Sequence, residues 1–94
     1  MNGDEFQWDD NKAASNYAKH GISFDNAKRV FNDLNGLEQI DTREWYGEER
    51  FTIVGMVNER LLFVVYTMRG EAIRIISARG AEPIEERDYY DNQS

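Results

Sequence analysis

The sequence contains no cysteine and a single histidine. Without cysteine the chain can form neither a disulfide nor a zinc–thiolate site, and it has no thiolate nucleophile. One histidine is too few for a histidine-based metal centre, and no spacing of carboxylates indicates a site for a hard cation. A glycine-rich phosphate loop and a nucleophile-elbow pattern are both missing as well. The sequence therefore predicts no metal and no cofactor.

A hydrophobic run long enough to cross a membrane, about 20 residues as a helix, is also lacking. The longest apolar run, Leu61–Tyr66, has the length of a strand. The first residues, Met1–Glu5, are acidic and polar, whereas a secretory signal is basic and then apolar. We therefore expect a cytoplasmic protein without a membrane partner. A length of 94 residues predicts one domain over residues 1–94.

Positive charge is in the minority, with 11 Lys and Arg against 18 Asp and Glu and a net charge of −7. This balance argues against general affinity for nucleic acid, because such binding depends mainly on neutralising phosphates. The arginines are nevertheless concentrated in and beside the β-rich segments, while the acids gather near the two ends of the chain. Since a guanidinium is a forked donor that suits phosphate, we expect a local anion site on the sheet.

Helix signals occupy the first third of the chain. Asp9 or Asp10 can cap a helix that ends before Gly21, a residue suited to the position after the last helical turn. Ser23 is a suitable N-cap for a second helix. Apolar residues at three- and four-residue steps predict one buried face on that helix. They are Ala27, Val30, Phe31 and Leu34.

Strand signals fill the middle of the chain, and runs of 4–10 β-rich residues predict about four strands. The predicted strands are Leu37–Asp41, Arg50–Val57, Arg60–Met68 and Glu71–Arg79. Two-residue connections at Asn58–Glu59 and Arg69–Gly70 indicate antiparallel hairpins. Glu5–Trp8 is predicted to be a short edge strand, and Pro83 suits the first turn of a final helix.

These elements predict an α+β fold. Two N-terminal helices are expected to pack on an antiparallel sheet of about four strands, and a short helix that reaches about Tyr90 ends the chain. The central strands carry apolar residues toward both faces, so the face opposite the helices is expected to be covered by the tail or by a partner.

Two strand arginines, Arg74 and Arg79, are the first candidates for chemistry. A charge within so apolar a strand is costly unless it reaches solvent or a partner. Each arginine is therefore either a surface residue in an ion pair or part of a phosphate clamp. Arg79 is the stronger candidate for a clamp, because it ends its strand and can point into a groove.

Further candidates lie in and after the loop that precedes the second predicted strand. Glu48 or Glu49 can accept the proton of a ribose 2′-hydroxyl while Arg50 holds the phosphate. The alternative is a solvated loop with surface ion pairs of little value. Trp45 and Tyr46 can stack on a base, but we expect them to cover the core.

His20 is the only histidine, and histidine is the commonest general base near neutral pH. Its position immediately before Gly21 also suits an interaction of the ring with a helix C-terminus. Both roles remain open at this point.

Four blocks of sequence are informative when they are taken together. They are Phe6-x-Trp8-Asp9-x-x-Lys12-x-x-x-Asn16-x-x-Lys19-His20-Gly21-Ile22-Ser23-Phe24, Gly47-Glu48-Glu49-Arg50-Phe51, Leu61-Leu62-Phe63-Val64-Val65-Tyr66-Thr67, and Arg74-Ile75-Ile76-Ser77-Ala78-Arg79 with Ala81. Over about Phe6 to Tyr89 the chain resembles the BrnT family of toxins from bacterial type II toxin–antitoxin modules. The first and last blocks carry most of the specificity of this resemblance.

The resemblance implies a RelE-like fold and a ribonuclease that uses neither metal nor cofactor. It also implies an antitoxin partner of the BrnA type that carries the DNA-binding domain, so that operator DNA is reached only through the antitoxin. Whether the chain also forms a dimer stays open. By position, the resemblance implies functional roles for Lys19, His20, Glu48, Arg50, Arg74 and Arg79.

In the mechanism that these positions imply, the RNA 2′-hydroxyl attacks the adjacent phosphate. Glu48 or His20 is the base, Arg50 and Arg79 stabilise the developing charge, and Lys19 or Arg74 positions the phosphate. We add Arg43, which lies beside the predicted strands, as a further substrate-binding candidate.

The sequence departs from the family pattern in two places. Arg79 is followed by Gly80, where the family often has a second basic residue, and the tail from Glu82 onward is acidic. Both changes weaken binding to RNA phosphates. They favour an alternative function, in which a catalytically inactive homologue serves as a protein-binding or corepressor module. An acidic mimic of DNA is a further alternative, but the strand arginines argue against it.

Overall fold

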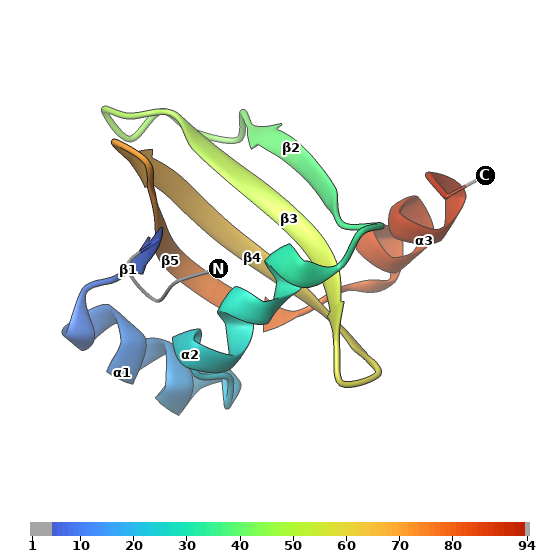
Figure 1. Cartoon of the computed structure of the whole chain (residues 1–94), viewed down its shortest axis with the longest axis horizontal. Coiled ribbons are helices and arrows are strands. Elements are labelled where there is room, and N and C mark those ends of the chain that lie inside the picture. The colour runs from blue at the N-terminus through green and yellow to red at the C-terminus, as the bar shows by residue number, and fades with distance from the viewer. Residues whose placement is uncertain (1–4, 94) are drawn as a thin grey trace.

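A computed structural model describes residues 5–93 as one twisted sheet with helices on both faces (Figure 1). The elements are β1 (Phe6–Gln7), α1 (Asp10–His20), α2 (Phe24–Ala27), the 3-10 helix η2 (Lys28–Asn32), β2 (Leu37–Asp41), β3 (Arg50–Val57), β4 (Arg60–Arg69), β5 (Ala72–Gly80) and α3 (Pro83–Asp91). The strand order is β1-β5-β4-β3-β2. The predicted α+β fold, with N-terminal helices and a short final helix, is confirmed. No helix within residues 5–93 is long and apolar enough to span a bilayer.

The sheet is mixed, because β1 pairs with β5 in parallel, while the pairs β2–β3, β3–β4 and β4–β5 are antiparallel. The β3–β4 turn is at Asn58–Glu59 as predicted, and both residues have positive φ angles of 49° and 67°. Such angles belong to the tight hairpin turn that matches the twist of the strands. The next turn is at Gly70–Glu71, one residue later than predicted, because Gly70 rather than Arg69 takes the left-handed conformation.

Local signals set the ends of the first helix. The Asp9 carboxylate accepts the backbone N–H groups of Asn11 and Lys12 at 2.8 and 3.2 Å. Gly21, with φ 71°, follows the last turn, and its N–H is bonded to the Tyr17 carbonyl. An N-cap that satisfies free amides and a left-handed C-terminal glycine are common helix boundaries. The predicted helix and its caps are therefore present.

The second helix differs from the prediction. Ser23 caps it as expected, but the α-helix ends at Ala27 and continues as η2, and Leu34 is fully exposed rather than buried. A 3-10 helix turns every three residues, so the four-residue step to Leu34 no longer returns to the same face. Asp33 has an extended backbone, which ends the helix before Leu34 is reached.

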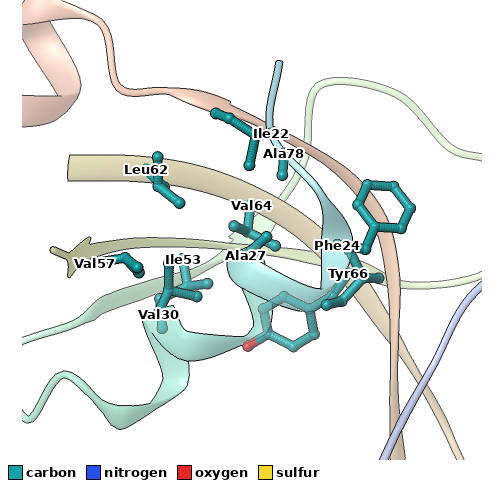
Figure 2. Packing of buried hydrophobic residues seen from close by; sticks show 11 residues of the cluster. Ile22, Phe24, Ala27, Val30, Ile53, Val57, Leu62, Val64, Tyr66 and Ala78 are labelled. Carbon is teal, nitrogen blue, oxygen red and sulfur yellow. The ribbon is translucent and has the colours of Figure 1, made fainter. Parts of the chain in front are cut away.

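The larger core cluster lies between the helices and one face of the sheet (Figure 2). Its buried members are Ile22, Phe24, Ala27, Val30, Ile53, Val57, Leu62, Val64, Tyr66, Ile75 and Ala78. The helical segment approaches β3 most closely at Gly55, where an added Cβ would lie 2.9 Å from the Val30 carbonyl oxygen. Val30 therefore packs directly on the strand backbone, and this fixes the distance between η2 and the sheet.

A smaller cluster covers the opposite face of the sheet. Buried Tyr89 of α3 packs there with Val54, Leu61, Phe63 and Val65. The expectation that the tail covers part of this face is confirmed. Because α3 occupies only one end of the face, the rest of the face is left for other side chains.

Asp33 connects three parts of the chain. Its Oδ2 accepts hydrogen bonds from the Met56 N–H at 2.8 Å and from the Tyr89 hydroxyl, and its Oδ1 accepts one from the Asn35 N–H at 2.9 Å. Burial alone would raise the pKa of Asp33, but these three hydrogen bonds outweigh it and lower the pKa. Burial, together with the bond to Asp33, raises the pKa of Tyr89 to about 12.

We expect Asp33→Asn to destabilise the protein at neutral pH and to flatten its acid denaturation. The Asp33 pKa is lower in the folded than in the unfolded chain, so its contribution is complete above the unfolded pKa of about 3.9. That contribution is lost as the pH falls through the folded pKa. Urea denaturation across pH 7 to 2 should therefore show that the difference in free energy of unfolding between wild type and variant shrinks below about pH 4. Asp88→Asn, at an exposed position on α3, is the control. A gap that does not change with pH would contradict this account of Asp33.

Asn16 joins α1 to the outer edge of β5. Its amide nitrogen donates to the carbonyls of Ala78 and Ile22 at 2.9 and 3.1 Å, and its amide oxygen accepts the Ala78 N–H at 3.0 Å. β1 pairs with this edge at Ile73 and Arg74, so at Ala78 the buried side chain takes the place of a missing strand. The backbone N–H and C=O groups of this buried edge are therefore hydrogen-bonded without a further strand.

Asn16→Ala should lower the free energy of unfolding by about 2–4 kcal/mol, because it leaves the buried N–H and C=O of Ala78 without partners. Chemical denaturation followed by circular dichroism measures the change. Ser15→Ala, at the neighbouring exposed position of the same helix, should alter stability by less than about 0.5 kcal/mol. Equal stability of the two variants would show that the Asn16 amide is not needed at this edge.

Candidate functional site

Three rows of side chains cross the face of the sheet that α3 partly covers. Residues paired across antiparallel strands point to the same face. The first row is Leu37, Val54, Phe63 and Arg79, and the second is Gln39, Thr52, Val65 and Ser77. The third contains the pairs Asp41–Arg50 and Thr67–Arg74. We call this surface, with the arginines Arg43, Arg50, Arg74 and Arg79, the arginine face.

Arg79 and Arg43 meet over one aromatic ring. The Arg79 guanidinium lies 4.2 Å from the centre of the Phe63 ring, and the Arg43 guanidinium lies 5.6 Å from it. The ring attracts both cations through its electron-rich face. The structure thus brings together two candidates that are 36 residues apart in the sequence, and Phe63 is the residue that positions them.

Arg79 is bound by α3. Its Nη1 and Nη2 donate to the two carboxylate oxygens of Glu85, both at 2.8 Å, and Nη1 also donates to the Gly80 carbonyl at 3.1 Å. Glu82 lies 3.9 Å away. The hydrogen bond from Arg79 is the main factor that counters burial and lowers the pKa of Glu85. The strongest candidate for a phosphate clamp is therefore paired with a carboxylate of its own chain.

Arg43 has a similar partner. Its Nε and Nη2 donate to the two carboxylate oxygens of Asp41, each at 2.8 Å. This fork, chiefly through its hydrogen bonds, lowers the pKa of Asp41 and raises that of Arg43. Asp41 ends β2, so the pair fixes the direction in which the following loop leaves the sheet.

Arg50 lies in a separate cluster at the start of β3. Its guanidinium stacks on Tyr46 at 3.8 Å, and its Nε is 3.7 Å from Glu48, which also accepts a hydrogen bond from Arg69 at 3.2 Å. Within residues 5–93 the buried Nε of Arg50 has no hydrogen-bond acceptor. A buried donor without a partner is unusual and marks a place where a ligand oxygen would be favourable.

The aromatic residues of the loop before β3 do not cover the core. Trp45 and Tyr46 are both exposed, so that expectation is wrong. The loop extends beyond the ends of β2 and β3, where no core is available to cover. Tyr46 instead supports Arg50, and the sequence signal for this role was an aromatic residue four positions before an arginine.

Lys19 and His20 line a different hollow, between α1 and the edge of β5. Its volume is about 350 Å³, and most of the residues that line it have a polar group in their side chains. The lining residues are Asn11, Lys12, Ser15, Asn16, Lys19, His20, Ile76 and Ser77. Ser77 also belongs to the second row of the arginine face, so the two regions adjoin across β5.

Arg74 lies at the β1–β5 edge, where its Nη1 donates to the Gln7 side chain at 3.0 Å. It shares the face but not the Phe63 cluster. Thus the seven candidates form three groups, Arg43 with Arg79, Glu48 with Arg50, and Lys19 with His20, while Arg74 lies beside them. Within residues 5–93 no three His, Asp or Glu side chains gather as a metal site, and no residue is assigned as a ligand.

The residues that sequence reasoning missed are Phe63, Asp41 and Glu85. Each contacts a candidate arginine through the fold, and only Asp41 is close to its partner in the sequence. Together the groups provide forked cations for phosphate oxygens and a carboxylate, Glu48, that can accept a proton.

The chain is similar to one known protein family over most of its length. A family model described as "Ribonuclease toxin, BrnT, of type II toxin-antitoxin system" matches residues 8–85. The chain therefore belongs to the BrnT family of ribonuclease toxins, and such a system implies an antitoxin protein as partner. The resemblance found in the sequence blocks is confirmed. No individual curated protein matches the sequence.

Proposed function

We propose that this chain is a metal-independent endoribonuclease, which acts in the cytoplasm and is neutralised by a BrnA-like antitoxin. The observation that carries the proposal is the arginine face, where cations from a loop and two strands surround a floor of small and aromatic side chains. On a chain with net charge −7, this gathering of arginines on one surface supports a site for phosphates.

The arginine face is long enough for more than one phosphate. Arg79 is in the first row and Arg50 in the third, and four residues along a strand span about 13 Å. The two therefore serve different phosphates. Arg79 and Arg43 hold one, and Arg50 holds the phosphate at which the strand is cut, with Glu48 beside it.

In the proposed reaction, Glu48 accepts the proton of a ribose 2′-hydroxyl. The 2′-oxygen forms a bond to the adjacent phosphorus, the bond from phosphorus to the 5′-oxygen breaks, and that oxygen leaves with a proton from solvent. Arg50 stabilises the charge on the phosphate oxygens through its Nε–H, which has no hydrogen-bond acceptor within residues 5–93. Lys19 and His20 bind the strand from the adjoining hollow, and Arg74 extends the cationic surface.

Purified, partner-free protein should cleave a labelled RNA in the presence of EDTA. Arg50→Ala should lower the rate by at least about 100-fold, because one preorganised charge donor is removed. Arg79→Ala should weaken RNA binding more than it slows the bound reaction. Arg29→Ala removes the same charge near the β3–β4 turn and should leave cleavage unchanged.

Circular dichroism confirms that each variant is folded before its activity is compared. Cleavage that stops with EDTA and returns with a divalent cation would refute metal independence. Cleavage that survives Arg50→Ala would remove that residue from the reaction.

The identity of the base can be tested by two variants. If Glu48 accepts the proton, Glu48→Gln should lower the cleavage rate by about 10²–10⁴-fold and leave RNA binding nearly unchanged. His20→Asn should weaken binding and leave the rate of bound RNA within a few-fold. The reverse pattern in single-turnover experiments would make His20 the base and give Glu48 the role of holding Arg50 and Arg69.

A second function, the inactive corepressor module, is favoured by one observation. Arg79 is already occupied by Glu85, and α3 carries further acids in place of a basic tail. In this function the chain binds its antitoxin but never cuts RNA. A folded, partner-free sample that cleaves nothing yet forms a stable complex with the antitoxin would support it.

A further inference from the structure

Glu85 occupies the Nη1/Nη2 fork of Arg79, which an RNA phosphate would use to bind this arginine end-on. We propose that Glu85 is a built-in competitor of the substrate phosphate, so that the first turn of α3 closes this part of the arginine face until RNA displaces it. The proposal rests on the proposed function for its substrate, RNA, but not on the cleavage step.

The hydrogen bonds of Arg79 occupy the end-on fork formed by its two Nη groups. Nη1 is bonded to Glu85 and to the Gly80 carbonyl, and Nη2 is bonded to the other oxygen of Glu85. One face of the guanidinium lies on Phe63. The Arg79 side chain is 25% exposed and that of Glu85 is 17% exposed. A phosphate can therefore take the two parallel N–H donors only if Glu85 leaves them.

The Glu85 carboxylate resembles the ligand it would exclude. A carboxylate and a phosphate both accept two parallel N–H bonds from a guanidinium at similar distances. The cations that act on Glu85 are Arg79 and Arg43, which are also the two cations assigned to the phosphate. The Glu82 carboxylate lies 3.9 Å from Arg79. RNA and Glu85 thus compete for the same donors.

The first turn of α3 is built so that it can move without unfolding the core. Glu85 also accepts the Glu82 N–H at 2.8 Å as part of a capping box, so its departure breaks one of the two bonds of that box. Ile84 in the same turn is 55% exposed. The helix stays anchored through Tyr89, which is buried in the second core cluster and bonded to Asp33.

An alternative is that Glu85 only orients Arg79 for catalysis. The two roles predict opposite effects of Glu85→Gln, which keeps an oxygen for the Glu82 N–H but removes the charge. If Glu85 competes with RNA, the variant protein should bind RNA more tightly than wild type. If Glu85 positions Arg79, the variant protein should bind RNA equally or less well and should lose activity.

The test uses a 2′-O-methyl RNA oligonucleotide, which has no 2′-hydroxyl to attack and reports binding alone. By fluorescence anisotropy at fixed salt, Glu85→Gln should bind it about tenfold more tightly than wild type, the size expected for one charge-assisted contact. Glu86→Gln, an exposed position in the same helix, is the matched control and should change affinity by less than about twofold. In an Arg79→Ala background, Glu85→Gln should give no gain.

Unchanged or weaker binding by Glu85→Gln, relative to Glu86→Gln, would overturn the proposal, as would a gain that persists without Arg79. A measurement on the wild-type protein tests the same proposal if the Glu85→Gln variant does not fold. Addition of the oligonucleotide should make the Glu82 amide exchange faster with solvent, because its acceptor has left, and unchanged exchange at saturation would also overturn the proposal.

These outcomes are separate from those for the enzyme. If the protein cleaves RNA but Glu85→Gln does not increase RNA affinity, the ribonuclease proposal stands and the proposal for Glu85 is refuted. If Glu85→Gln increases RNA affinity but the protein cleaves no RNA, the proposal for Glu85 stands and the ribonuclease proposal is refuted.

Discussion

The arrangement of the molecule depends on one side-chain amide. Asn16 satisfies both backbone groups of Ala78 and the carbonyl of Ile22, so a single residue joins the first helix, the following loop and the outer edge of β5. Arg79 is the next residue after Ala78, and Lys19 and His20 lie one turn beyond Asn16. The same contact that closes the sheet edge therefore sets the position of the hollow and of the arginine face relative to each other.

Electrostatic balance within the arginine face explains how an acidic chain keeps several arginines close together. Arg79 pairs with Glu85, Arg43 with Asp41, and Glu48 lies between Arg50 and Arg69. Each carboxylate reduces the repulsion between neighbouring guanidiniums and holds its arginine in one conformation. The cost is that any anionic substrate must compete with these carboxylates. Arg50 is the exception, because its buried Nε has an ion pair but no hydrogen bond within residues 5–93.

The parts of the fold that follow from short-range chemistry could be predicted from the sequence. Capping by Asp9 and Ser23, the glycine at position 21 and the hairpin at Asn58–Glu59 are local features, and each is present. The burial of Leu34 was predicted wrongly, because the helix is tightened where Val30 packs on Gly55, a contact between residues 25 positions apart. The pairing of Arg79 with Glu85 could not be predicted, since it depends on where α3 returns to the sheet. The candidate arginines could be chosen from the sequence by residue type, but only the register of the strands shows that they share a face.

The irregular pairing of β4 with β5 determines whether Arg74 and Arg79 lie on the same face of the sheet. Arg74 and Arg79 are an odd number of positions apart, so in an unbroken strand they would project from opposite sides of the sheet. Here Val65 pairs with Ser77 and Tyr66 with Ile75, which leaves Ile76 as an extra residue and restores the parity. The spacing of the two arginines therefore constrains the chain as strongly as their identity does. A homologue that kept the five-residue spacing but paired its strands without the extra residue would keep both cations in its sequence but would carry only one on this surface.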